Sequence, residues 1–205
     1  EGRVAWLKHC LDEMNRPVGS LLDFGCGDGA TTPLLFNATN ATSAVGVDVS
    51  TKSLEIARKL HANERIRFES IGDFQSAGQI DLAYCNGVFH HIPPPDRASA
   101  LAIVYEALRE VGLFSFWENN PWSLATRYVM SRCAFDRDAI MLSPPEARAL
   151  LRNGGFEILR TDFRFVFPRA FKAFRKIEDW LYRMPLGAQF HVLCRKTRTA
   201  RIPGA

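Results

Sequence analysis

Short apolar runs alternate with amphipathic segments along most of the chain. The runs cover residues 20–24, 44–48, 66–70, 80–85, 111–117, 156–163 and 188–194, and they predict seven buried strands. Helical spacing occurs over 3–15, from about 30 to 36, over 50–61, after 96, and over 143–153 and 168–183. This alternation predicts an α/β fold with an open, mostly parallel sheet and helices on both faces.

Local capping signals support two of these helices. Ser50 precedes the helical pattern at 51–61 and is a good N-cap, because its hydroxyl can accept a backbone N–H of the first turn. Ser143-Pro144-Pro145-Glu146 has the spacing of a capping box, and Asn153-Gly154-Gly155 is a matching helix stop. Both helices are therefore expected to begin beside these serines.

The composition is that of an ordinary globular protein. Of 205 residues, 47% are hydrophobic and 23% are charged, which suits one domain with a substantial core. No apolar run approaches the ~18 residues of a membrane span. Basic residues gather near the C-terminus, at Arg195, Lys196, Arg198 and Arg201. So short a run favours a solvated end over a nucleic-acid or lipid contact.

Cysteine and histidine spacing gives no sign of a metal site. The five cysteines are scattered without a Cys-x-x-Cys pair, so neither a zinc site nor a disulfide framework is indicated. His9, His61 and His191 have no partner at metal-binding spacing and are expected to be structural. We therefore expect no metal, and a reducing, cytoplasmic location by default.

The stretch from Leu21 to Gly29 carries the clearest chemical signal. An apolar run ends in Asp23, and Gly25-Cys26-Gly27-Asp28-Gly29 follows it before a helical segment. Glycine is needed where a tight turn has positive φ or where backbone approaches a ligand. The free N–H groups at the start of the next helix then face whatever lies over the turn. This pattern predicts a nucleotide-type binding loop.

Acidic residues after the next two strands narrow the choice of nucleotide. Asp48 ends the second strand, where a carboxylate can accept both ribose hydroxyl protons. Asp73 follows the third strand and suits an adenine amino group, with Phe74 beside the ring. A nicotinamide oxidoreductase would share Asp48, but its Gly-x-Gly-x-x-Gly turn places the third glycine one residue later. The pattern favours a ligand with a ribose, an adenine and a cationic tail.

These residues resemble the class I S-adenosylmethionine-dependent methyltransferases. The matching segments are Leu22–Gly29, Val45–Ser50, Gly72–Phe74, Ile80–Ile92 and the strand that ends in Glu118. The resemblance implies a doubly wound, Rossmann-like sheet of seven strands in the order 3-2-1-4-5-7-6, with strand seven antiparallel. It also implies S-adenosylmethionine as cofactor and S-adenosylhomocysteine as product. Residues 1–118 would form the cofactor-binding half and 119–205 the substrate side.

The same resemblance assigns parts of the cofactor to particular residues. The glycine turn would lie against the methionine part, Asp48 would bind the ribose, and Asp73 with Phe74 the adenine. Asn86 and Gly87 would lie under the sulfonium and amino group. The expected cofactor-binding set is Asp23, Phe24, Gly25, Cys26, Gly27, Gly29, Asp48, Val49, Asp73, Phe74, Asn86 and Gly87.

The sequence departs from the family before the fifth strand. The family usually has a Leu-Lys/Arg-Pro-Gly-Gly loop there, whereas Leu108-Arg109-Glu110-Val111 runs almost directly into Gly112. Either the loop is short, or residues are absent at this point.

Methyl transfer is an in-line displacement on an activated sulfonium, so the protein chiefly positions the reactants. A base helps only where the acceptor must lose a proton. His90 and His91 follow the fourth strand, and one of them, preferably His91, is a candidate base; the alternative is that the pair caps the loop. Glu118 is a candidate for binding an acceptor or taking up a proton, or else a partner for backbone N–H groups.

We therefore expect a methyltransferase acting on a small-molecule or lipid-like acceptor through O, N or C, with neither a nucleic-acid partner nor a membrane span. Residues 119–122, Asn-Asn-Pro-Trp, resemble the Asn-Pro-Pro-Tyr signature of amino-methyltransferases, but that signature belongs after strand four. Nucleic-acid methylation is therefore a weaker alternative. A non-catalytic protein that binds S-adenosylmethionine or an adenosyl ligand is another, and the sequence does not predict the oligomeric state.

Overall fold

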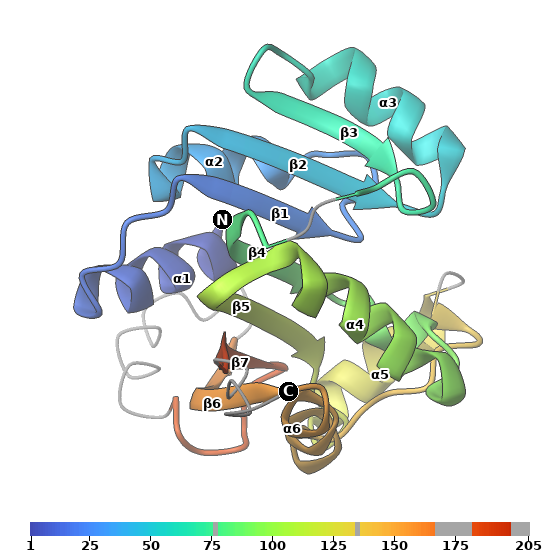
Figure 1. Cartoon of the computed structure of the whole chain (residues 1–205). Coiled ribbons are helices and arrows are strands. Elements are labelled where there is room, and N and C mark those ends of the chain that lie inside the picture. The colour runs from blue at the N-terminus through green and yellow to red at the C-terminus, as the bar shows by residue number, and fades with distance from the viewer. Residues whose placement is uncertain (76–77, 134–135, 167–181, 198–205) are drawn as a thin grey trace, which may run out of the picture. The chain divides into compact units, whose positions relative to one another are not determined.

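The computed structural model describes residues 1–75, 78–133, 136–166 and 182–197 (Figure 1). Across these residues, seven strands form a sheet in the order β3-β2-β1-β4-β5-β7-β6, with β7 antiparallel. The strands are β1 (Ser20–Phe24), β2 (Ser43–Asp48), β3 (Ile66–Ser70), β4 (Ile80–Asn86), β5 (Leu108–Asn119), β6 (Phe156–Arg164) and β7 (Gln189–Lys196). The predicted strand order and the antiparallel seventh strand are confirmed.

The helices follow the expected alternation. They are α1 (Gly2–Glu13), α2 (Thr32–Thr39), α3 (Thr51–His61), α4 (Arg97–Ala107), α5 (Leu124–Arg132) and α6 (Pro144–Asn153), with 3-10 turns η1 (Phe89–His91) and η2 (Pro94–Asp96). Ser50 caps α3, because its hydroxyl accepts a hydrogen bond from the Ser53 N–H at 3.2 Å. The capping box of α6 also forms, with the Ser143 N–H donating to the Glu146 carboxylate at 2.7 Å. Both predicted helix starts are confirmed.

The chain divides into two compact units. The first comprises Glu1–Cys85, Val104–Ser115 and the chain from Lys196 onward. The second comprises Asn86–Ile103 and Phe116–Arg195.

In the first unit, parallel strands build the frame of the glycine turn. β1 pairs with β2 and with β4, and β2 pairs with β3, so that Leu22 lies opposite Val45 and Ala83. Most residues of β1 and β2 are buried, which explains why these strands showed continuous apolar runs in the sequence rather than alternation. Helix α3 lies along β3 (Figure 1). The parallel pairing brings the ends of β1 and β2 together.

The junction before β5 differs from the expectation. The strand begins at Leu108 rather than Val111, and α4 ends directly before it at Ala107. Val111 has φ of +56°, a left-handed conformation that β-branched residues rarely adopt. Its carbonyl accepts a 2.8 Å hydrogen bond from the Arg16 guanidinium. The five residues Leu108–Gly112 thus form a tight link of the same length as the family's loop, with valine where that loop has its first glycine.

Part of the basic C-terminal run is also used inside the first unit, where we expected a solvated end. The Lys196 ammonium donates to the carbonyls of Tyr105 and Leu108 at 2.7 and 2.8 Å, beside the last residues of α4. It also lies 4.3 Å from the centroid of the Tyr105 ring. Cations at helix C-termini satisfy carbonyls that have no partner within the helix. Arg198 and Arg201 lie outside the described residues.

The second unit has an aromatic core. The Phe89 ring lies 5.1 Å from that of Phe116, and the rings of Phe116 and Phe163 each lie 6.5 Å from Phe190. All four side chains are buried. The helix expected over 168–183 lies almost entirely outside the described residues. Among the helices that are described, none has both the length and the apolar character needed to cross a bilayer.

Candidate functional site

The glycine turn adopts the backbone that its sequence predicted. Gly25, Gly27 and Gly29 have φ values of +74°, +56° and +77°. The N–H groups of Gly25 and Cys26 donate to the carbonyl of Val47 at 2.8 and 3.0 Å, which holds the turn over the end of β2. Positive φ at three alternate positions explains why glycine occupies each of them.

The two later glycines of this turn have different surroundings. A Cβ placed on Gly27 would have no heavy atom within 4 Å, whereas one on Gly29 would lie 2.8 Å from Ala57 and from the Phe68 ring. Gly29 therefore allows close packing inside the unit, while Gly27 faces open space. A ligand can approach the backbone at Gly27.

Asp48 lies beside that open position. Its Oδ2 accepts the Gly27 N–H and its Oδ1 accepts the Ser50 N–H, each at 2.8 Å. The residue is half-buried, so the carboxylate keeps a side toward solvent. Because each carboxylate oxygen has two lone pairs, Asp48 can still accept ribose hydroxyl groups.

Asp23 lies beneath the turn in a buried position. Its Oδ2 accepts a 2.7 Å hydrogen bond from the Thr32 hydroxyl, and it is only 2% exposed. Burial, opposed in part by this bond and helped by the charge of Asp48, raises the pKa of Asp23 to about 7. Burial also raises the pKa of Cys26, so its thiol is an inert spacer and not a nucleophile. Phe24, between them, is buried in the core.

The expected adenine-side residues lie at the surface of the first unit. Asp73 is exposed and Phe74 is half-buried, and both of their N–H groups donate to the Ser70 carbonyl at 3.0 Å. Val49 is 77% exposed, directly after Asp48. These side chains are therefore accessible to a ligand, although their contacts with one stay a prediction.

At the end of β4, Asn86 carries a buried polar atom that needs a donor. Among the described residues, its Oδ1 has no hydrogen-bond partner. Gly87 follows with φ of +67°, and its N–H donates to the Trp117 carbonyl at 2.9 Å. A buried acceptor without a donor is costly unless a ligand or water supplies one. Asn86 thus has the chemistry expected of a residue that receives a ligand N–H.

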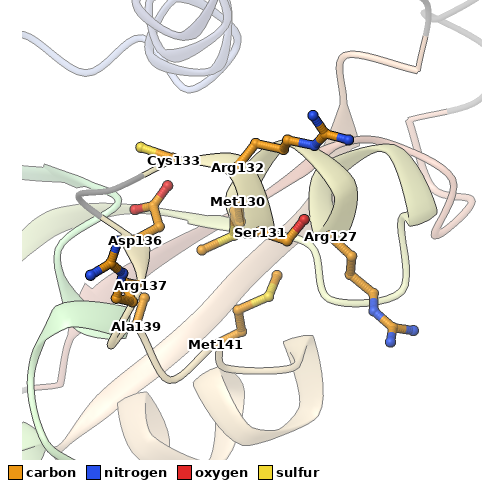
Figure 2. A pocket seen from close by; sticks show the side chains of 9 residues that line it. All are labelled: Arg127, Met130, Ser131, Arg132, Cys133, Asp136, Arg137, Ala139 and Met141. Atoms are coloured by element: carbon orange, nitrogen blue, oxygen red, sulfur yellow. The ribbon is translucent and has the colours of Figure 1, made fainter.

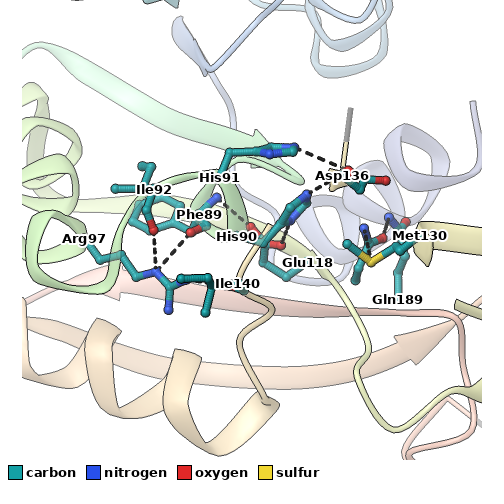
Figure 3. A network of polar contacts seen from close by, with 11 residues as sticks. Phe89, His90, His91, Ile92, Arg97, Glu118, Met130, Asp136, Ile140 and Gln189 are labelled. Carbon is teal, nitrogen blue, oxygen red and sulfur yellow. Dashed lines mark hydrogen bonds and ion pairs between the residues drawn. The ribbon is translucent and has the colours of Figure 1, made fainter. Parts of the chain in front are cut away.

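His90 and Glu118 form a buried pair in the second unit (Figure 3). The His90 Nδ1 lies 2.5 Å from the Glu118 Oε2, and the Phe89 N–H donates to the Glu118 Oε1 at 2.7 Å. Glu118 is fully buried and His90 is 3% exposed. Both oxygens of Glu118 are thus engaged within the protein, so it acts by fixing the orientation of the His90 ring.

Asp136 joins the two histidines from a distant part of the chain. Its Oδ1 lies 3.6 Å from the His90 Nε2 and 3.5 Å from the His91 Nε2. Burial alone would lower the pKa of His90, but the hydrogen bond to Glu118 and the charges of Glu118 and Asp136 together raise it. The pKa of His91 is lowered by burial and by the neighbouring His90. The two predicted histidines therefore differ in their pKa: that of His90 is raised, whereas that of the more accessible His91 is lowered, which favours its neutral form.

Arg97 holds this loop in place, and the sequence analysis missed it. Its Nε donates to the carbonyls of Phe89 and Ile92, each at 3.0 Å, and its Nη2 donates to the Ile140 carbonyl at 2.5 Å. The Ile140 N–H in turn donates to the His90 carbonyl at 2.8 Å. No role in the site was predicted for Arg97 or Asp136, because the contacts that define their roles join distant segments.

The asparagines that resembled an amino-methyltransferase signature have internal partners. The Asn120 Nδ2 donates to the carbonyls of Pro185 and Gly187 at 3.2 and 2.8 Å. The Asn119 Oδ1 accepts a 3.0 Å hydrogen bond from the Gln189 amide. Both amides hold β5 against the chain that leads into β7.

A cavity of about 390 Å³ adjoins Asp136 in the second unit (Figure 2). Its lining includes Arg127, Arg132 and Arg137, together with the side chains of Met130 and Met141. Among the residues that line the cavity, the charged ones are therefore three arginines and Asp136.

Comparison with known proteins supports this reading of the fold. Residues 22–114 match a family model described as a methyltransferase domain. A trans-aconitate 2-methyltransferase from Rhizobium etli is 28% identical over 116 residues, which cover 51% of this chain and 44% of that protein. A ubiquinone biosynthesis O-methyltransferase from Bordetella avium is 27% identical over 175 residues, which cover 76% and 68%. This chain spans less than half the length of the first curated relatives it matches.

The fold is shared with solved structures at low sequence identity. One is the 1,6-didemethyltoxoflavin-N1-methyltransferase of Burkholderia thailandensis, crystallised with its namesake ligand and S-adenosylhomocysteine. It superposes with a TM-score of 0.64 at 20% identity, covering 97% of this chain and 78% of that one. At this identity the likeness establishes the architecture alone.

Proposed function

We propose that this chain, which belongs to the class I S-adenosylmethionine-dependent methyltransferases, transfers a methyl group from S-adenosylmethionine to a small anionic acceptor. The observation that carries the proposal is the open backbone at Gly27 beside the Asp48 carboxylate. A ligand atom can approach the Gly27 backbone there, because a Cβ built on Gly27 would have no heavy atom within 4 Å.

The residues of the turn fit the cofactor chemically. The open turn at Gly25, Gly27 and Gly29 would receive the methionine part, and Asp48 the ribose. Asp73 with Phe74 would contact the adenine, whose amino group needs an acceptor and whose ring needs an apolar neighbour. In the second unit, the buried Oδ1 of Asn86, which has no partner among the described residues, would accept a hydrogen bond from a ligand N–H group.

The cofactor supplies an activated methyl group on a sulfonium. The protein's task is then to hold the acceptor in line with that group and to exclude water. His91 would take a proton from an acceptor hydroxyl, because its lowered pKa keeps the imidazole neutral near pH 7. Glu118 would act through His90, since both of its oxygens are engaged within the protein.

The basic residues around the cavity beside Asp136 support an anionic acceptor. Arg127, Arg132 and Arg137 would attract a carboxylate-bearing molecule. The names of the curated relatives, a trans-aconitate 2-methyltransferase and a ubiquinone biosynthesis O-methyltransferase, are consistent with a small molecule that is methylated on oxygen. The internal partners of Asn119 and Asn120 speak against a nucleic-acid acceptor held by those amides.

We also propose that the protein works in the cytoplasm. All five cysteines are free thiols, and four of them are buried. This is the state expected in a reducing compartment.

Isothermal titration calorimetry with S-adenosylmethionine and S-adenosylhomocysteine tests the cofactor assignment. Wild type should bind both, Asp48→Ala should lose at least tenfold in affinity, and Asp12→Ala, an exposed acid on α1, should bind as wild type does. The proposal fails if neither compound binds at high micromolar concentration, or if Asp48→Ala leaves the affinity unchanged.

A turnover assay separates an enzyme from a non-catalytic binding protein. Transfer of labelled methyl from S-adenosylmethionine to a panel of small carboxylic acids should produce S-adenosylhomocysteine. Binding of the cofactor without turnover on such acids or on cell extract would favour the non-catalytic alternative.

A further inference from the structure

His90, His91 and Asp136 present three metal-ligand atoms to one point in the second unit (Figure 3). These atoms all lie within 4.8 Å of one another, and the Asp136 oxygen is 3.6 and 3.5 Å from the two Nε2 atoms. This cluster could not be predicted from sequence spacing, because Asp136 is more than forty residues beyond the histidine pair.

The spacing suits an ion between these groups better than direct hydrogen bonds. Charge-assisted N–H···O bonds are about 2.7–2.9 Å long. Ligand atoms about 2.0–2.1 Å from a tetrahedral metal are instead separated by roughly 3.3–3.4 Å. The two measured distances lie much closer to the second value.

Glu118 provides the outer partner that metal-binding histidines usually have. It occupies the Nδ1 of His90 at 2.5 Å, which leaves the Nε2 facing Asp136. A carboxylate on the far nitrogen fixes the tautomer and makes the imidazole a better ligand. The Phe89 N–H on the other oxygen holds Glu118 itself in place.

The cluster is also held together before any ion arrives. The Ile140 N–H bonds to the His90 carbonyl, and Arg97 bonds to the carbonyls of Phe89, Ile92 and Ile140. These contacts fix the segment that follows Asp136 against the histidine loop. Little of the binding free energy would therefore be lost in ordering the ligands.

We propose that His90, His91 and Asp136 bind one divalent transition-metal ion, with Zn²⁺ the best match to two imidazoles and a carboxylate. Two neutral histidines with the charges of Asp136 and Glu118 balance a divalent cation. Asp136 also lines the 390 Å³ cavity, so the fourth ligand position is open to an oxygen atom of a small acid held there. That role for the acceptor rests on the proposed methyl transfer, whereas binding of the ion does not.

Cobalt(II) is a direct probe of the site, because its visible absorption reports tetrahedral coordination by nitrogen and oxygen. The 205-residue chain is stripped with a chelator and titrated with Co²⁺, and Zn²⁺ is then added in competition. One equivalent of Co²⁺ should develop the tetrahedral spectrum, and Zn²⁺ should abolish it. His91→Ala and Asp136→Asn should each abolish the spectrum.

Two further variants sharpen the test. Glu118→Gln should weaken Co²⁺ binding by about 10- to 100-fold, as loss of an outer partner does at other sites. His9→Ala removes an exposed histidine that is paired with Glu13 on α1, and it should bind Co²⁺ as wild type does. Circular dichroism checks that each variant is folded.

A wild-type protein that binds no Co²⁺ in tetrahedral form, or an Asp136→Asn variant that binds it unchanged, overturns the proposal. In that case Asp136 and Glu118 are partners of a protonated His90. Calorimetry with S-adenosylhomocysteine on the same samples reports the cofactor site separately. Failure of the metal site therefore leaves the proposed methyl transfer standing with His91 as its base, whereas a bound ion would occupy the His91 Nε2 and exclude that role for His91.

Discussion

The hydroxyl of Thr32 donates a 2.7 Å hydrogen bond to the Asp23 carboxylate, and both residues are buried beneath the glycine turn. This bond opposes, but does not cancel, the cost of placing a carboxylate there. The pKa of Asp23 stays at about 7, against 3.8 for the free side chain. Because the pKa of Asp23 is raised, the fold favours the protonated form of this carboxyl group. The free energy of unfolding therefore falls as pH rises from 3.8 to about 7.

The first prediction follows from this shift. Asp23→Asn should change the free energy of unfolding little near pH 4, and should stabilise the fold increasingly between pH 4 and 7. The difference should then stay constant, at an upper bound on the order of 4 kcal/mol for a shift of about three pKa units. Urea unfolding of both proteins at pH 4, 5.5, 7 and 8.5 measures it. A difference that is independent of pH would show that Asp23 is ionised throughout.

The second prediction concerns the donor. Thr32→Val keeps the side-chain volume and removes the hydroxyl, so it should destabilise the fold by about 1–3 kcal/mol above pH 7. Thr32→Ser retains the hydroxyl and should lose less at that pH. Thermal melts of the two variants at pH 8 make the comparison, and equal losses would mean that packing of the methyl group, rather than the bond, matters.

The third prediction distinguishes Gly27 from Gly29, the two later glycines of the turn, by the effect of an added methyl group. Gly27→Ala and Gly29→Ala both force alanine into a left-handed conformation, at a cost of roughly 1–2 kcal/mol. Only at Gly29 does the new Cβ also meet Ala57 and Phe68 at 2.8 Å, which adds about 1–3 kcal/mol of overpacking.

Among folded molecules, Gly27→Ala should weaken cofactor binding more than Gly29→Ala does, although Gly29→Ala is the less stable variant. Gly27→Ala places a methyl group in the open space proposed for the cofactor and should weaken S-adenosylhomocysteine binding by at least tenfold. Denaturant unfolding and calorimetry on the two variants supply both quantities. Wild-type affinity in Gly27→Ala would move the cofactor away from this turn.

The fourth prediction concerns Val111. Its φ of +56° destabilises the fold by about 1–3 kcal/mol for a non-glycine residue. Glycine removes this strain but itself destabilises the fold by roughly 0.5–1 kcal/mol, because it has more conformational freedom in the unfolded chain. Val111→Gly should therefore stabilise the fold by about 1 kcal/mol, or about 2–4 °C in Tm. Val111→Ala should stabilise less, because it keeps a Cβ. Calorimetric melts test this, and a lower Tm for Val111→Gly would mean that valine's packing outweighs the backbone cost.

The sequence predicted those parts of the molecule that depend on local rules. Buried parallel strands produce continuous apolar runs, and Ser50 and Ser143 mark helix starts through bonds within one turn. Gly25, Gly27 and Gly29 were predictable for the same reason, since positive φ selects glycine.

The rest depended on contacts between distant segments. No site role was predicted for Asp136, and only the fold brings it to His90 and His91. Lys196 read as part of a solvated basic tail, yet it binds the end of α4. The turn at Val111 was missed because valine conceals a conformation that glycine would have revealed.

Main-chain atoms of Ile140 join the segment after Asp136 to the histidine loop. The Ile140 N–H donates to the His90 carbonyl, and the Ile140 carbonyl accepts a hydrogen bond from Arg97. Substitutions at Arg137 and Ala139 would therefore alter the lining of the adjoining cavity without removing either of these hydrogen bonds. Natural selection could exchange one acceptor for another there while the reacting groups keep their positions. This short stretch is where related sequences should diverge fastest, and where libraries for altered substrate preference should begin.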